Sequence, residues 1–156
     1  MSGRRRRIKC YVEQVKDFDE YGVTLMKQER GVPLARCLIP ETDLEDGQQV
    51  VVAGIGMIER FQQTVPLGLR AQIDSISGGV VKVDNIYDCT AGGPILNPTS
   101  NRFVGMITSI EKDSWLKSGR ASFCPLTLSS PLWIKIGQAM QRYLAERLRH
   151  LPVQTL

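Results

Sequence analysis

The sequence predicts an all-β barrel domain that ends in a single α-helix. Short segments rich in β-branched residues alternate apolar and polar side chains, separated by Gly, Asn and Asp, at a spacing of roughly ten residues. This spacing is typical of all-β domains, whereas βαβ units would place a helical period between strands. The helical period begins only at residue 130, and 156 residues suffice for one domain with a hydrophobic core.

The predicted strands follow this alternation, and turn-forming residues bound each of them. They cover residues 8–14, 22–27, 49–56, 67–77, 80–84, 103–108 and 121–126. Polar stretches predict turns at 16–21 and 41–47 and surface loops at 57–65 and 111–120, and residues 31–40 are expected to be a connector. Gly78-Gly79 predicts the tight turn of a hairpin.

The C-terminal helix is predicted over residues 130–151. Ser130 can cap it, Pro131 suits its first turn, and Pro152 ends the pattern. The apolar stripe recurs every four residues and consists of Leu132, Ile136, Met140, Leu144 and Leu148. We expect this stripe to pack on the barrel. The alternative is a helix that faces a partner or a membrane surface, which Lys135, Arg142, Arg147 and Arg149 outside the stripe would favour.

Residues 84–110 contain the one motif with a chemical signature. Cys89, Thr90 and Ala91 precede the rigid turn Gly92-Gly93-Pro94. Glycine permits positive φ or a close backbone approach, and proline then restricts φ as the chain leaves the turn. A second turn at 97–101 leads into the strand at 103–108. The pattern predicts a loop that presents something at the barrel surface.

This motif resembles the nucleophile loop of trypsin-like serine peptidases, including the HtrA branch, in which G-D/N-S-G-G-P/A is followed by a hairpin and V-x-G-I. The resemblance spans roughly residues 19–145 and implies a trypsin-like β-barrel. It divides the chain into a basic tail, a first-barrel remnant with connector, a nearly complete second barrel, the helix and a short tail. These parts are residues 1–7, 8–38, 39–128, 130–151 and 152–156, and residues 8–151 form the domain.

Two further segments are similar to the same family. Asp19-Glu20 before residues 22–27 resembles the segment that carries the triad aspartate, although no carboxylate falls in the matching register. The strand at 121–126 falls where the resemblance implies a substrate-flanking strand. Tyr87 stands where secreted relatives carry a cysteine, so the resemblance implies no disulfide there.

The catalytic residues of that family have no intact counterpart in this sequence. Ala91 occupies the position of the nucleophilic serine and has no atom that can attack a carbonyl. The sole histidine, His150, stands at the end of the predicted helix, where it suits the helix dipole. Cys89 and Thr90 lie two residues and one residue too early to replace the serine. The backbone N–H groups of Cys89 and Ala91 are expected to keep an oxyanion-hole geometry before Gly92 and Gly93.

The sequence therefore predicts a catalytically inactive peptidase-like domain that binds a protein or peptide, with a homo-oligomer as one form of partner. An extended segment could add to a barrel edge, as substrates do. The alternative is a serine endopeptidase in which Ala91 replaces a native serine and the histidine comes from elsewhere. No cofactor is expected.

Composition narrows the metal sites, membrane spans and cellular compartments that we expect. The four cysteines, Cys10, Cys37, Cys89 and Cys124, form no C-x-x-C pair, and with one histidine they offer no tetrahedral zinc set. No apolar run reaches the roughly 18 residues that a membrane span needs. The N-terminus lacks the apolar core of a secretory signal, so we expect an intracellular protein, cytoplasmic or nuclear.

A basic cluster opens the chain. Arg4, Arg5, Arg6 and Arg7 supply much of the net charge of +4. Such a cluster can contact phosphates without sequence preference or act as a nuclear address. A nucleic-acid or nuclear adaptor is thus a third functional class, beside the simpler interpretation of a solvated tail.

Overall fold

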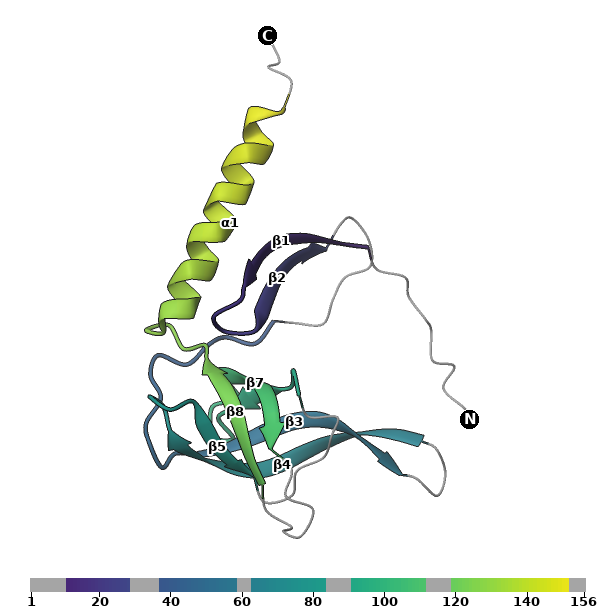
Figure 1. Cartoon of the computed structure of the whole chain (residues 1–156), viewed down its shortest axis with the longest axis vertical. Helices are drawn as coiled ribbons and strands as arrows, with labels where there is room; N and C mark the ends of the chain where they lie inside the picture. The colour runs from purple at the N-terminus through teal and green to yellow at the C-terminus, as the bar shows by residue number, and fades with distance from the viewer. Residues whose placement is uncertain (1–10, 29–36, 59–62, 84–90, 112–118, 152–156) are drawn as a thin grey trace. The chain divides into compact units, whose positions relative to one another are not determined.

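The computed structural model describes residues 11–28, 37–58, 63–83, 91–111 and 119–151 (Figure 1). The chain divides into two compact units. The barrel unit is Leu38–Lys135. The hairpin–helix unit combines Met1–Cys37 with Ile136–Leu156. Residues 1–7, Cys89, Thr90 and Tyr87 lie outside the described residues, so the predictions on them stay predictions.

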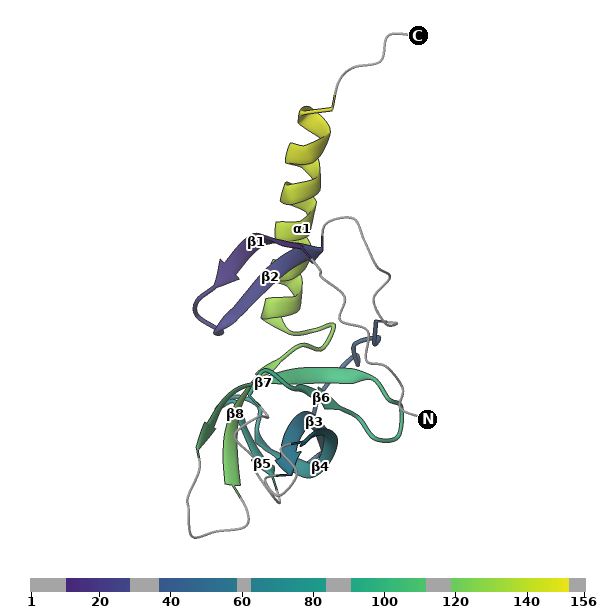
Figure 2. The same cartoon turned by 90° about the vertical axis from the view of Figure 1, so that its right-hand side faces the viewer.

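Six antiparallel strands close the barrel unit in the order β3-β4-β5-β8-β7-β6 (Figures 1 and 2). They are β3 Gln49–Ile58, β4 Gln63–Ser75, β5 Val80–Val83, β6 Pro94–Leu96, β7 Phe103–Glu111 and β8 Gly119–Pro125. The short β6 closes the circle, since Leu96 pairs with Val51 of β3 and Pro94 pairs with Met106 of β7. The predicted all-β barrel followed by one helix is confirmed.

The barrel core comes from the inward half of each alternating strand. In β4, Ala71 and Ile73 are buried, while the alternating residues Arg70 and Gln72 are exposed. β-branched side chains pack well on such a pleated, half-buried surface. The buried cluster consists of Val50, Val52, Leu69, Ala71, Ile73, Val81, Val83, Ile95, Val104, Ile107, Ala121 and Phe123.

The close approach of β8 explains why residue 105, in the middle of β7, is a glycine. A Cβ at this position would lie 2.7 Å from the carbonyl oxygen of Cys124 on β8. Any larger residue would therefore push the two strands apart. The predicted hairpin turn at Gly78-Gly79 is confirmed, and Gly79 has a φ of +63° there.

The hairpin–helix unit contains β1 Val12–Phe18, β2 Val23–Gln28 and most of α1 Pro131–Arg149. β1 and β2 pair antiparallel, and the helix lies beside them in both views (Figures 1 and 2). Among the described residues of this unit, only Phe18 and Ala139 are buried hydrophobics. Its apolar core is therefore small compared with that of the barrel.

Three predicted boundaries were wrong. Residues 16–18 belong to β1 and not to a turn, because they pair with β2 beyond a bulge after Gln14, and the turn comes at 19–22. The predicted loop at 57–65 is largely strand. β3 and β4 extend as a long hairpin whose last pair is Ile58 with Gln63. Likewise Glu111, Gly119 and Arg120 belong to strands β7 and β8, since cross-strand pairing continues to Glu111 opposite Arg120.

The helix was predicted correctly, but the burial of its stripe was not. Leu132 is fully buried, whereas Met140, Leu144 and Leu148 are 49, 52 and 67 % exposed. The stripe predicted by spacing alone therefore serves the core only near its start. Ser130, the predicted cap, donates its hydroxyl to the carbonyl of Thr127 at 2.7 Å, which fixes the chain as it enters α1.

Candidate functional site

The glycine turn before β6 is built as the motif predicts, within the described part. Gly92 has a φ of +81°, a conformation that disfavours residues with a Cβ. Its N–H donates to the carbonyl of Ile107 at 2.8 Å, and the N–H of Ile107 donates to the carbonyl of Gly93 at 2.9 Å. These two bonds fasten the turn to the middle of β7. Ala91 precedes the turn and is exposed.

Beyond this point the β6 side of β7 has no neighbour among the described residues, and we call this side the open edge. β6 contributes only three residues and pairs with β7 no farther than Met106, whereas β7 continues to Glu111. Within the described ranges, no strand pairs with residues 108–111 on the β6 side. An unpaired strand edge presents backbone donors and acceptors to any extended segment that lies against it. The open edge thus begins directly beside the glycine turn.

The register shows which backbone groups face this edge. The N–H of Phe123 in β8 donates to the carbonyl of Gly79, away from β7. Backbone groups alternate sides along an antiparallel strand, so Ser122 faces β7, where it pairs with Ser109. The next residue of β7, Ile110, therefore directs its N–H and C=O away from β8, toward the open edge.

The strand implied as substrate-flanking, residues 121–126, is paired on both sides only in its first part. β8 pairs with β5 on one side, from Gly119 to Ser122, and with β7 on the other, from Arg120 to Pro125. Gly119 to Ser122 are thus flanked by β5, and the substrate-flanking role implied for residues 121–126 stays a prediction.

The predicted catalytic positions fall in different elements and in different units of the described chain. Asp19 and Glu20 lie in the turn between β1 and β2, and His150 follows the end of α1 as an exposed residue. His150 belongs to the hairpin–helix unit, whereas Ala91 belongs to the barrel unit. Over the described residues, no three His, Cys, Asp or Glu side chains gather as a metal-binding group. No helix there has the length and apolar character needed to cross a membrane.

Cys124 is the cysteine whose surroundings in the barrel are best defined. It is buried in β8, and burial raises the pKa of its thiol to about 11. A thiol of this kind stays protonated near neutral pH and is a poor nucleophile. Cys37, by contrast, is exposed.

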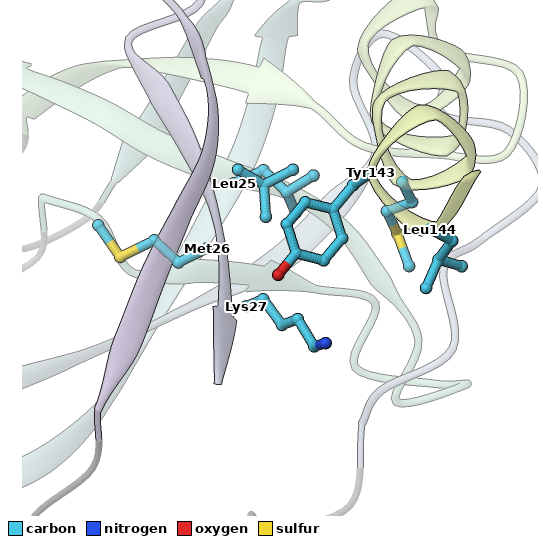
Figure 3. A pocket seen from close by; sticks show the side chains of 7 residues that line it. Leu25, Met26, Lys27, Tyr143 and Leu144 are labelled. Carbon is cyan, nitrogen blue, oxygen red and sulfur yellow. The ribbon is translucent and has the colours of Figure 1, made fainter. Parts of the chain in front are cut away.

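The hairpin–helix unit holds a second feature, an open apolar hollow of about 170 Å³ between its strands and α1 (Figure 3). Tyr143 reaches from the helix toward the hairpin in this view, with Leu25 and Lys27 beside it. The hollow is lined by Val15, Leu25, Met26, Lys27, Met140, Tyr143 and Leu144.

A charged cluster adjoins Tyr143. Its hydroxyl donates to the carboxylate of Glu13 on β1 at 2.7 Å and accepts from the guanidinium of Arg147, which also pairs with Glu13. The hydrogen bond from Tyr143, aided by Arg147, holds the pKa of Glu13 below its ordinary value of 4.5, against the opposing effect of desolvation. The amine of Lys27 lies 5.2 Å from the centre of the Tyr143 ring.

Neither the open edge nor this cluster followed from the sequence patterns. Tyr143 and Arg147 stand four residues apart, a spacing that pairs side chains on a helix, but nothing in the sequence selects Glu13 as their partner. The bulge that turns Ile110 toward the edge likewise depends on pairing between distant strands.

No family model matches the chain, and no curated protein matches it. The function of the chain must therefore be inferred from its own residues and from the geometry around the glycine turn.

Proposed function

We propose that the chain is a catalytically inactive, trypsin-like peptidase domain that binds an extended segment of a protein or peptide by adding it as a strand to the open edge of β7. The observation that carries this proposal is that β6 is short and begins only at Pro94, directly after the glycine turn. It leaves residues 108–111 of β7 without a described neighbour on that side.

Three features support the proposal. A closed antiparallel barrel with a glycine turn before a short strand is the arrangement that the resemblance implies. Strand addition needs an accessible backbone more than particular side chains, and Ile110 directs its backbone groups to the edge. Ala91 at the nucleophile position then makes the domain a binder, because a methyl group cannot form an acyl intermediate.

The test separates the backbone of Ile110 from its side chain. This side chain is half-buried against the barrel core, so Ile110→Ala and Ile110→Pro both lose its packing. Only proline also removes the N–H that faces the edge. A random peptide library displayed on phage would be selected against the wild-type chain, and the recovered peptides measured on both variants.

We expect the selected peptides to bind the alanine variant and to bind the proline variant about tenfold more weakly, the effect of losing one backbone hydrogen bond. Protection of the Ile110 amide from hydrogen exchange in the complex would locate the strand. Equal binding by the two variants, or a library that yields no binder, would refute the proposal.

A further inference from the structure

The exposed part of α1 carries an unusual combination of residues. Within its hairpin–helix portion, a single face presents Gly137, Met140, Gln141, Leu144, Ala145 and Leu148. All six are exposed, and Met140 and Leu144 at one border of this face also line the open hollow. At 3.6 residues per turn, this face covers about two fifths of the helix circumference and includes no charged side chain. Arg142, Glu146 and Arg149 lie on other faces.

The described residues of the chain offer no reason for a glycine at position 137. Glycine inside a helix lowers stability relative to alanine, and here a Cβ would meet no other atom within 4 Å. Its φ is not positive, so the backbone does not require glycine either. A small residue on an exposed apolar face is explained when a second helix approaches closely at that point.

The hairpin–helix unit also exposes apolar side chains that a second molecule could cover. Its described residues bury only Phe18 and Ala139, while most of the exposed large hydrophobics of the described chain belong to it. These are Tyr11, Val12, Met26, Met140, Leu144, Leu148 and Leu151. Exposed apolar area of this kind marks an interaction surface.

We propose that this face of α1 binds the same face of a second copy of the chain, as an antiparallel helix pair. An uncharged face does not repel its own copy, which suits the two-fold symmetry of a homodimer. A parallel pair would gather Arg147 and Arg149 of both copies at one end, and these are the basic residues of the last turn. The antiparallel pair separates them and opposes the helix dipoles.

One antiparallel register matches large residues with small ones. When Gly137 of one copy faces Leu148 of the other, Met140 faces Ala145 in the same register. The leucine then occupies the space that the glycine leaves. This pairing is independent of strand addition at β7, which belongs to the barrel unit.

The experiment is sedimentation equilibrium of the full chain over a range of concentrations. We expect a reversible dimer. Leu148→Gln should weaken it by at least about tenfold, because the substitution removes the leucine side chain from the apolar interface. Arg142→Gln is the matched control on another face and should leave the association unchanged. Gly137→Ala should raise the thermal midpoint of the dilute monomer and yet weaken the dimer, since alanine favours the helix but blocks close approach.

A mixture of Gly137→Cys and Leu148→Cys chains, oxidised and then digested, should yield the peptide linked between these two positions. A chain that stays monomeric at every concentration would overturn the proposal, and so would a dimer that Gly137→Ala and Leu148→Gln leave intact. A monomer that binds vesicles of anionic phospholipid through Leu148 would overturn it in favour of a membrane surface.

Discussion

The hydroxyl of Tyr143 in α1 donates a 2.7 Å hydrogen bond to the carboxylate of Glu13 in β1, across 130 positions of sequence. Arg147 contacts both groups, and Lys27 of β2 lies over the tyrosine ring. This cluster therefore joins both strands of the hairpin to the helix in a unit that has little apolar core.

Stability of this unit should fall in acid because of Glu13. Its pKa is lowered in the folded state, chiefly by the hydrogen bond from Tyr143. A group whose pKa is lowered by folding stabilises above its unfolded pKa, and the contribution is lost as the pH falls through the folded value. We expect wild type to lose more stability than Glu13→Gln as the pH drops below about 4.5.

Denaturant unfolding at several pH values measures this difference, with Glu146→Gln as a control on the exposed surface of α1. Carbon NMR titration of Glu13 gives the direct value, and Tyr143→Phe should move the pKa back toward 4.5. Parallel pH profiles for wild type and Glu13→Gln would contradict the assignment.

Gly105→Ala should destabilise the barrel. Its Cβ would lie 2.7 Å from the backbone oxygen of Cys124, and overpacking of this kind costs about 1–3 kcal/mol. Gly68→Ala is the control, since its Cβ would make an ordinary 3.5 Å contact with Val51. Thermal unfolding compares the two. A Gly105→Ala protein as stable as Gly68→Ala would show that β7 and β8 can separate freely.

The two ends of the helix stripe should respond differently to truncation. Leu132 is fully buried, so Leu132→Ala should cost about 2–5 kcal/mol of unfolding free energy. Met140 is half exposed, and Met140→Ala should cost about 1 kcal/mol or less in the dilute monomer. Chemical denaturation of both variants at low concentration is the measurement. Equal losses would mean that Met140 is buried in solution.

Thiol labelling should distinguish the two described cysteines. Cys37 is exposed, whereas Cys124 is buried with a pKa raised to about 11. With iodoacetamide at pH about 8, we expect rapid modification of Cys37 and none of Cys124 until denaturant is added. Peptide mass spectrometry follows both sites. Equal modification rates for Cys37 and Cys124 in the folded protein would reveal that the β8 side of the barrel opens readily.

The chain should hydrolyse no peptide or ester, and fluorophosphonates should not label it, because Ala91 offers no nucleophile. Ala91→Ser is expected to remain inactive as well, since a serine alone lacks a base to take its proton. Fluorogenic peptide assays and probe labelling of both proteins are the measurements. Turnover by Ala91→Ser would favour the alternative of a serine endopeptidase.

Local patterns were enough for the elements themselves. Alternation in segments such as 67–77 predicted strands, Gly79 predicted a hairpin turn, and the four-residue period after Ser130 predicted the helix. The glycine turn at Gly92 also followed from sequence, because few residues other than glycine adopt positive φ easily. These features depend on neighbours in the chain, so the sequence carries them directly.

What lies beyond those neighbours was decided by the tertiary structure. Only the pairing of β7 with β6 and β8 shows that Ile110 turns its backbone groups away from β8, toward a side that has no described neighbour. The four-residue spacing made Leu132 and Leu148 equivalent, yet one is fully buried and the other 67 % exposed. Amphipathic spacing specifies a face of a helix, whereas burial depends on what packs against it, and distant segments supply that.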